Sequence, residues 1–202
     1  MDFSPVNTTS EYLDLPLRAL LDLVASGGPA PGGGSVAAIA VALAAGLSGM
    51  AARMSAGQLA DADRLADRAD AARQRVAPLA RIDAESYGRV LDAYREPDSE
   101  TRRERVSDAL SGATDVPLAV AEIGNEVASV AARLVEEGNP NLEGDAIAAV
   151  LLAEAGVRAA TVLVEINLSA ANVDDDRLGR ANELVDETAA IVRRATEDHR
   201  QG

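Results

Sequence analysis

The sequence contains no cysteine and no lysine, and it has a single histidine. Without cysteine, neither a thiol nucleophile nor a disulfide framework is available. Because all 19 basic residues are arginine, Schiff-base chemistry and a phosphate-loop lysine are excluded as well. The histidine, His199, lies in the polar C-terminal tail. A His/Cys metal site is therefore not expected, and no metal is predicted.

Aromatic residues make up 2% of the chain, whereas hydrophobic residues as a whole make up 48%. The interior must therefore be filled by Ala, Val, Leu and Ile, and such small side chains favour helices that pack tightly together. Alternating runs of Val, Thr and Tyr between Asn-Gly or Asp-Gly turns, which indicate strands, are absent. The predicted fold class is all-α.

The formal net charge is −14, and this argues against a nucleic-acid partner, because neutralising phosphates requires a concentrated positive surface. The first residues, MDFSPVNTTSEYLDL, lack the basic and apolar regions of a secretion signal. Residues 36–52 approach the length of a short membrane span, but Ala and Gly dominate them, which favours a buried bundle helix. We therefore expect no membrane partner and a cytoplasmic location.

The spacing of apolar residues predicts an antiparallel bundle of about six helices, some of them long and kinked, in a single domain spanning residues 1–202. Thr9 or Ser10 can cap the first helix, and Ser99 or Asp98 the fourth. Pro78 and Pro117 are expected to kink the third and fourth helices. The predicted ranges are 10–26, 33–56, 59–94, 99–134, 142–168 and a last helix opening at 174–177.

The segment PAPGGGSVAAIAVALAAGLSGM (29–50) places three consecutive glycines directly before the second helix. It is no phosphate loop, because no strand precedes it and no lysine follows. The unpaired N–H groups at the helix start, together with the helix dipole, can bind an anion or a carbonyl oxygen. The alternative is a tight connection that lets the first helix fold back over the second.

Asp83 is a candidate proton-transfer group because it lies three or four residues from Leu79 and Tyr87, next to an apolar face. An unpaired carboxylate there is costly to bury. Its pKa is either raised, which suits an acid or base, or it pairs with an arginine such as Arg53. Asn167, in an apolar turn, either satisfies a backbone group or contacts a ligand, and Tyr87 either stacks on a flat ring or packs in the core.

The glycine segment resembles the signature of the formimidoyltetrahydrofolate cyclodeaminase and methenyltetrahydrofolate cyclohydrolase family. Its members carry a P-x-PGGGS-[VA]-A-A block that enters an Ala-rich helix. Three further blocks of the family resemble segments of this chain in the same order. They are RIDAESYGRVLDAYREPDSETRRER (81–105), ATDVPLAVAEI (113–123) and GNPNLEGDAIAAVLLAEAGVRAATVLVEINL (138–168).

The resemblance implies a helical, commonly dimeric enzyme that acts on one-carbon units bridging two nitrogens of tetrahydrofolate. One branch hydrolyses the methenyl bridge to a formyl group, and the other closes the ring from the formimino form and expels ammonia. We favour the cyclohydrolase, because the chain carries no attached formimidoyl-transfer domain. A reduced folate is the expected partner, as substrate, and no further cofactor is expected.

The resemblance also extends the candidate site. Asp83 and Asp145 become the candidate catalytic acids, although Asp145 would equally serve as a helix cap. Residues that would bind the substrate are those of the glycine loop, with one aromatic and two amide side chains elsewhere: Pro31, Gly32, Gly33, Gly34, Ser35, Tyr87, Asn139 and Asn167.

The chain departs from the family pattern at two positions. Many members have a lysine-containing segment just after the second helix, where this chain has Gln58, and an Asn shortly before Ile-Asn, where it has Leu163. These departures, with the small-residue faces that suit helix association, leave a non-catalytic helical bundle that binds a ligand or a partner as a further alternative.

Overall fold

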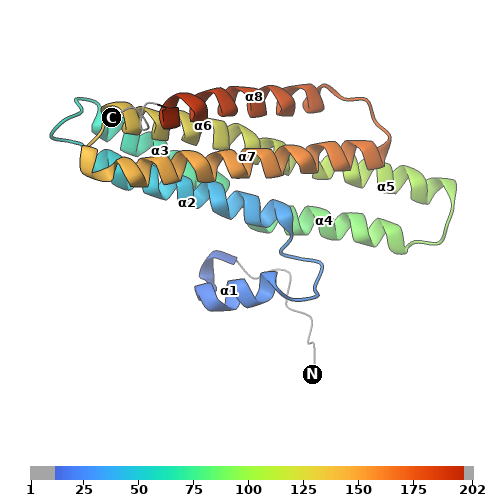
Figure 1. The fold of residues 1–202 in the computed structure, drawn as a ribbon. Helices are drawn as coiled ribbons and strands as arrows, with labels where there is room; N and C mark the ends of the chain where they lie inside the picture. The colour runs from blue at the N-terminus through green and yellow to red at the C-terminus, as the bar shows by residue number, and fades with distance from the viewer. Residues whose placement is uncertain (1–11, 198–202) are drawn as a thin grey trace.

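The computed structural model describes residues 12–197, and this part of the chain forms an all-α bundle with no strand, as predicted. Segments α2, α5–α6 and α8 run in one direction, and α3–α4 and α7 run in the other (Figure 1). The elements are η1 Tyr12–Asp14, α1 Leu17–Val24, α2 Gly33–Arg53, α3 Ala62–Val76, α4 Leu79–Arg95, α5 Glu100–Ala113, α6 Asp115–Glu137, η2 Pro140–Leu142, α7 Glu143–Ala171 and α8 Asp176–Glu197.

Two of the predicted helices are each divided into two by proline. Pro78 lies between α3 and α4, and Pro117 is the third residue of α6, directly after the end of α5. Proline lacks the N–H that would bond to the carbonyl four residues back, and its ring clashes with that carbonyl. Ala77, Pro78 and Thr114 keep right-handed helical dihedrals at these two junctions, so the predicted kinks are confirmed as bends between consecutive helices.

The N-terminal helix is shorter than predicted. A 3₁₀ turn, η1, and the eight-residue α1 replace the described part of the expected helix. No residue of α1 is buried, and α1 lies on the outside of the bundle below α2 (Figure 1). The predicted caps Thr9 and Ser10, like His199, lie outside the described residues. At α5 the Ser99 cap is confirmed, because its hydroxyl accepts a hydrogen bond from Arg102 N at 3.1 Å.

The centre of the bundle is formed by α2, α6 and α7, which pack on one another through Ala and Val side chains. The close spacing depends on glycine. A Cβ on Gly124 of α6 would lie 2.6 Å from Val157 Cγ2 of α7, which is closer than packed side chains allow. Small residues thus let these helices approach closely, as the composition predicted.

By length and composition alone, α2 and the segment 140–171 would each be apolar enough to cross a membrane, and about half of each is buried inside the bundle. The core helix of a globular protein has the same composition, so this is weak evidence for a membrane span.

Candidate functional site

A cavity of about 310 Å³ opens where the start of α2 meets α4 and the C-terminal part of α7. This volume is at the lower end of the range for small-molecule pockets. Asp83 is the only carboxylate among the described residues that line the cavity. The lining comprises Pro29, Ala30, Gly32, Gly33, Gly34, Asp83, Ala84, Tyr87, Ala113, Leu163, Ile166 and Asn167.

The Asp83 carboxylate lies directly against the first turn of α2. A Cβ built on Gly34 would lie 2.5 Å from Asp83 Cγ and 2.7 Å from Oδ2, so a side chain at position 34 would have to displace the carboxyl. The Ser35 hydroxyl lies 3.1 Å from Asp83 Oδ2. No glycine of the loop has a positive φ. At Gly34, therefore, glycine is required for the close approach of α2 to a carboxylate of α4.

The start of α2 retains free hydrogen-bond donors. Its first intrahelical bond is from Val36 N to Gly32 O, at 3.1 Å. Among the described residues, the backbone N–H groups of Gly33 and Gly34 have no acceptor. Both glycines line the cavity. Together with the positive end of the helix dipole, these donors favour an oxygen or an anion at the cavity wall.

Burial raises the pKa of the Asp83 carboxyl above its usual range, and hydrogen bonds from Ser35 act in the opposite direction. Tyr12, buried in η1, has its own pKa raised by burial and by the negative charges of Asp83 and Glu85. The alternative that Asp83 pairs with Arg53 is wrong, because Arg53 forms its ion pair with Asp70. Asp83 has no ion pair within the described residues, which suits a group that exchanges protons.

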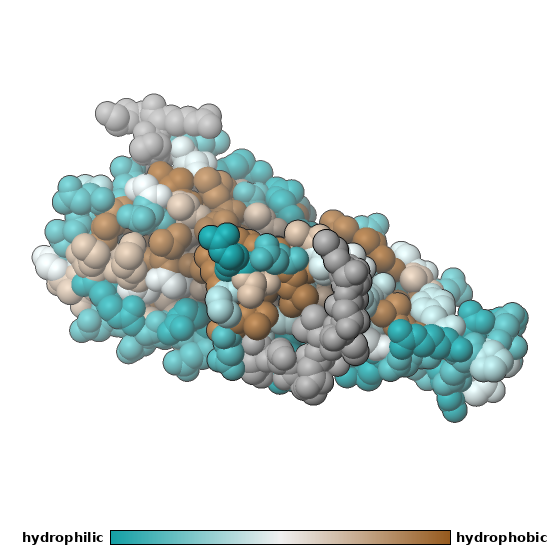
Figure 2. All heavy atoms as spheres, turned by 90° about the horizontal axis from the view of Figure 1, so that it is seen from below, coloured by the Kyte–Doolittle hydropathy of each residue, from teal (hydrophilic) through white to brown (hydrophobic). Residues whose placement is uncertain are grey.

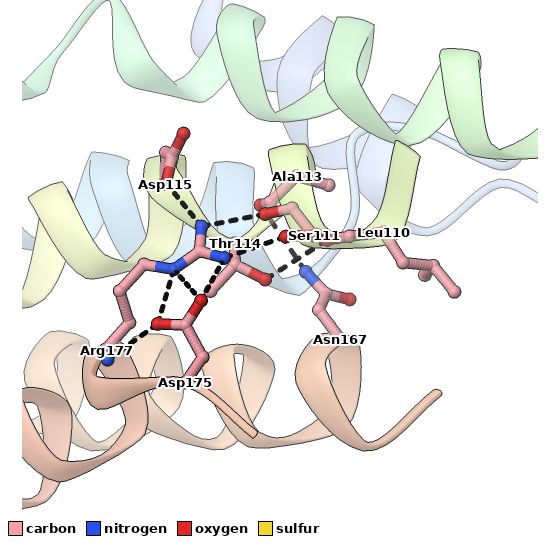
Figure 3. A network of polar contacts seen from close by, with 8 residues as sticks. All are labelled: Leu110, Ser111, Ala113, Thr114, Asp115, Asn167, Asp175 and Arg177. Carbon is pink, nitrogen blue, oxygen red and sulfur yellow. Dashed lines mark hydrogen bonds and ion pairs between the residues drawn. The ribbon is translucent and has the colours of Figure 1, made fainter. Parts of the chain in front are cut away.

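The opposite wall of the cavity is formed where α5 ends. Because Pro117 has no N–H, the carbonyl of Ala113 lacks its helical donor. Asn167 of α7 replaces this donor, with its Nδ2 at 3.4 Å from Ala113 O (Figure 3). This bond fixes which end of the amide is which. Oδ1 of Asn167 then remains as an acceptor to which no described residue donates.

Arg177, near the start of α8, stabilises the junction between α5 and α6 from outside the cavity. Its guanidinium donates to the Ser111 carbonyl at 2.9 Å, to the Ser111 hydroxyl at 2.8 Å and to Asp115 at 2.6 Å (Figure 3). It also pairs with Asp175, which lowers the pKa of that carboxyl. The kink between α5 and α6 is thus held in place from both α7 and α8.

The structure brings most of the predicted site residues together. Gly32, Gly33, Gly34, Asp83, Tyr87 and Asn167 all line the cavity. Pro31 is buried in the same loop but is not part of the lining, and its peptide bond with Ala30 is cis. Ser35 is also outside the lining. Its side chain is fully buried and contacts Asp83 and Ala80, so it is not placed to contact a ligand directly.

Asp145 and Asn139 lie at the other end of α7. Asp145 is in the first turn of that helix, and 18 residues separate it from Leu163, or about 27 Å along the axis. Asn139 accepts a hydrogen bond from Asn141 N at 3.0 Å and donates to Met54 O at 3.1 Å. Within one chain neither residue reaches the cavity, and Asn139 ties the turn before α7 to the end of α2.

Several lining residues were not recognised as site residues from the sequence. Ala113 and Ile166 carry no polar side chain that would single them out, and Leu163 was noted only as a departure from the family pattern. Tyr12, beside Asp83, is one of three tyrosines in the chain. A single aromatic residue in a polar segment was the signal that could have identified it as a site residue. Gln58, the other departure, is exposed in the turn after α2 and does not line the cavity.

Metal ligands are not gathered in the described part of the chain. Residues 12–197 contain no group of three or more His, Cys, Asp or Glu side chains placed to hold a metal ion. At the cavity, the donors are one carboxylate, one amide and backbone N–H groups. This set suits an organic ligand with several hydrogen-bonding atoms.

Comparison with known proteins shows what the chain is similar to. The family described as Formiminotransferase-cyclodeaminase matches residues 16–187. The methenyltetrahydrofolate cyclohydrolase of Methylorubrum extorquens is 33% identical over 197 residues, covering 90% of this chain and 94% of that protein. The formimidoyltransferase-cyclodeaminase of Gallus gallus is 31% identical, covering 93% of this chain but only 35% of that protein.

A solved structure shares the fold. It is described as formiminotetrahydrofolate cyclodeaminase from Thermotoga maritima and superposes with a TM-score of 0.80 at 27% identity. The match covers 93% of this chain and 98% of that one. The two proteins therefore share the same arrangement of helices.

Proposed function

Because the chain belongs to the formiminotransferase-cyclodeaminase family, we propose that it is a folate one-carbon enzyme, a methenyltetrahydrofolate cyclohydrolase. The observation that carries this proposal is the position of Asp83. One carboxyl with a raised pKa lies in a cavity beside the free N–H groups of Gly33 and Gly34. A flat heterocycle with a positively charged bridge and several acceptor atoms suits such a site.

The reaction makes limited demands on the protein. A water oxygen bonds to the bridge carbon, one carbon–nitrogen bond breaks, and its electron pair stays on nitrogen. Of the two protons of the water, one ends on that nitrogen and the other goes to solvent. A group whose pKa is raised toward neutrality moves such a proton most effectively, and Asp83 is the carboxyl in the cavity.

The remaining lining residues orient the folate. The N–H groups of Gly33 and Gly34 donate to its oxygen or ring nitrogen atoms, and Oδ1 of Asn167 accepts from one of its N–H groups. Tyr87, which is 46% exposed at the rim, offers a face for stacking. A cavity of about 310 Å³ holds the ring system, and the tail of the folate extends beyond it.

The cyclodeaminase is the second candidate. The cyclohydrolase is preferred because the relative of that name is matched over 94% of its length, whereas the vertebrate bifunctional relatives are matched over about a third. In favour of the cyclodeaminase, the Thermotoga maritima structure is described as a cyclodeaminase and is matched over 98% of its chain. The same acid serves either reaction, since the departing nitrogen accepts a proton in both.

One assay with two substrates separates the candidates. Purified protein is given the methenyl folate, and the loss of its absorbance is compared with the spontaneous rate. In parallel it is given the formimino folate, and ammonia is measured. Faster loss of the methenyl absorbance without ammonia supports the cyclohydrolase. Ammonia release without hydrolysis replaces it with the cyclodeaminase, and a thermal shift with folates but no turnover in either assay favours the non-catalytic bundle.

The proposal includes a homodimer, a cytoplasmic location and no cofactor besides the folate. Support for the dimer comes from the outward face of α2, where Val36, Leu43 and Met50, together with Met54 directly after the helix, are between 37% and 60% exposed. Apolar surface is extensive on the face seen from below (Figure 2). Leu43→Glu is expected to shift the sedimentation coefficient toward that of a monomer, whereas Tyr94→Glu, on α4, leaves it unchanged. The opposite pattern would place the dimer contact elsewhere.

A further inference from the structure

Ser35 is a fully buried serine with two acceptors for one proton. Its Oγ lies 2.7 Å from the Ala80 carbonyl and 3.1 Å from Asp83 Oδ2. A serine hydroxyl has a single proton to donate and two lone pairs that accept. It therefore cannot donate fully to both oxygens. The carbonyl of Ala80 is the nearer of the two, at the usual distance for a hydroxyl donor.

If the Ser35 proton lies toward Ala80, the contact with Asp83 has to be made differently. An ionised carboxylate can only accept hydrogen bonds, so two acceptors would then face each other at 3.1 Å. A protonated Asp83 instead donates from Oδ2 to the lone pair of Ser35. Three groups then form a directed chain, from Asp83 through Ser35 to the Ala80 carbonyl.

The surroundings of Asp83 contain influences in both directions. In its ionised form Asp83 accepts hydrogen bonds from the backbone N–H and the hydroxyl of Ser35, which lower its pKa, and the helix dipole at the start of α2 acts in the same direction. From η1, Tyr12 lies near the carboxyl, and on α4 Arg81 and Glu85, which pair with each other, stand two residues before and two residues after Asp83. On α7 the cavity wall consists of Leu163, Ile166 and Asn167, none of which titrates. No described arginine pairs with Asp83, so no cation opposes protonation by direct contact.

We propose that Ser35 is a positioning residue, which holds the transferable proton of Asp83 on Oδ2 by donating its own proton to Ala80. The proposal rests on the proposed function for its catalytic meaning. In the hydrolysis, the proton on Oδ2 passes to the nitrogen as the carbon–nitrogen bond breaks. A proton from the attacking water restores the carboxyl, and the second proton of the water goes to solvent.

The test compares two pairs of proteins by thermal unfolding across pH. The first pair is the wild type and Asp83→Asn, and the second is Ser35→Ala and the double variant Ser35→Ala/Asp83→Asn. A raised folded pKa destabilises the protein progressively between the unfolded and the folded pKa of the acid, and the isosteric amide removes this loss. The pH at which the stability difference within a pair stops growing therefore reports the folded pKa of Asp83.

We expect this end point to lie at lower pH in the Ser35→Ala pair, because the alanine no longer accepts from the protonated carboxyl. A shift to higher pH would mean that Ser35 donates to the ionised form, and an unchanged end point would mean that it acts on neither. Either result overturns the proposal. Ser48→Ala is the matched control, since Ser48 is a fully buried serine of α2 that donates to a carbonyl, Ala44 O, at 2.9 Å.

Turnover of the methenyl folate provides a second readout. In Ser35→Ala the high-pH fall of kcat should move to lower pH, with kcat reduced about two- to tenfold at a pH where wild type is still active, the factor that one hydrogen bond represents. If the unfolding end point shifts as expected but the wild type turns over no folate, the proposed function fails and the role of Ser35 stands. If Ser35→Ala does not fold, Ser35→Cys replaces it, because a thiol is a weak acceptor of nearly the same shape.

Discussion

Two neighbouring glycines of the loop, Gly33 and Gly34, differ in the space around them. A methyl group on Gly34 would overlap the Asp83 carboxyl, lying 2.5 Å from Cγ, whereas on Gly33 its nearest neighbour would be Leu163 Cδ1 at 3.9 Å. Gly34→Ala must therefore displace Asp83, while Gly33→Ala makes an ordinary contact. Both residues lie in the first turn of α2, so the two substitutions change the helix propensity in the same direction.

The magnitude follows from these contacts. Overpacking of a buried site lowers the free energy of unfolding by about 1–3 kcal/mol. Replacing glycine by alanine in a helix raises it by up to about 1 kcal/mol. The free energy of unfolding of Gly34→Ala should thus fall by about 1–2 kcal/mol. For a chain of this length that corresponds to a melting temperature lower by about 2–8 °C. Gly33→Ala should match the wild type or exceed it slightly.

Differential scanning calorimetry measures this contrast, and kinetics extends it. A carboxyl displaced by about 1 Å is expected to lose about 10²-fold in kcat/KM. For Gly33→Ala we expect mainly a higher KM, because that methyl group points into the cavity. The reasoning would be refuted if Gly34→Ala were as stable and as active as Gly33→Ala.

A double variant checks that Asp83 is the cause. In the Asp83→Ala background the carboxyl is absent, so adding Gly34→Ala should cost no stability. The coupling between the two positions should then be stabilising, by about 0.5–3 kcal/mol. Additive effects of the two substitutions would show that Gly34 is required for another reason.

Three further variants test the cavity walls. Asn167→Leu leaves the Ala113 carbonyl without its donor and removes Oδ1, so both stability and folate affinity should fall, each by about 1–3 kcal/mol by calorimetry; an unchanged affinity would exclude Asn167 from the ligand site. Arg177→Met should lower the melting temperature by roughly 3–6 °C, whereas Arg158→Met, which removes only a surface pair with Glu154, should leave it within about 1 °C; equal effects would contradict the role given to the α5–α6 junction. Asp145→Asn should keep kcat/KM within about threefold of wild type, and a loss as large as that of Asp83→Asn would bring that end of α7 into the site.

The fold was largely predictable from the sequence because long apolar repeats leave little choice of secondary structure. The positions of the kinks were predictable too, because proline removes a helical N–H wherever it stands. The groups that satisfy the freed carbonyls were not predictable. At Pro117 that group is Asn167, about 50 residues later, and Arg177, about 60 residues later, binds the Ser111 carbonyl of the same junction.

The candidate site, too, was only partly predictable from the sequence. Asp83 could be found because an acid beside an apolar face requires a partner or a function. Asp145 and Asn139 could not be assigned from the sequence, since residues that cap helices and residues that bind ligands are of the same types, and within one chain both lie near the end of α7 away from the cavity. The contacts of Ser35 with Ala80 and Asp83 span 45 and 48 positions, and no local spacing encodes them.

The central claim is that Asp83, held against the start of α2, transfers the proton in folate chemistry. The most direct measurement is the turnover of methenyl folate by Asp83→Asn, with its folate affinity determined in parallel. We predict a loss of kcat of at least about 10²-fold with the reduced folate still bound. Turnover at the wild-type rate, by a variant that binds folate normally, would contradict the account.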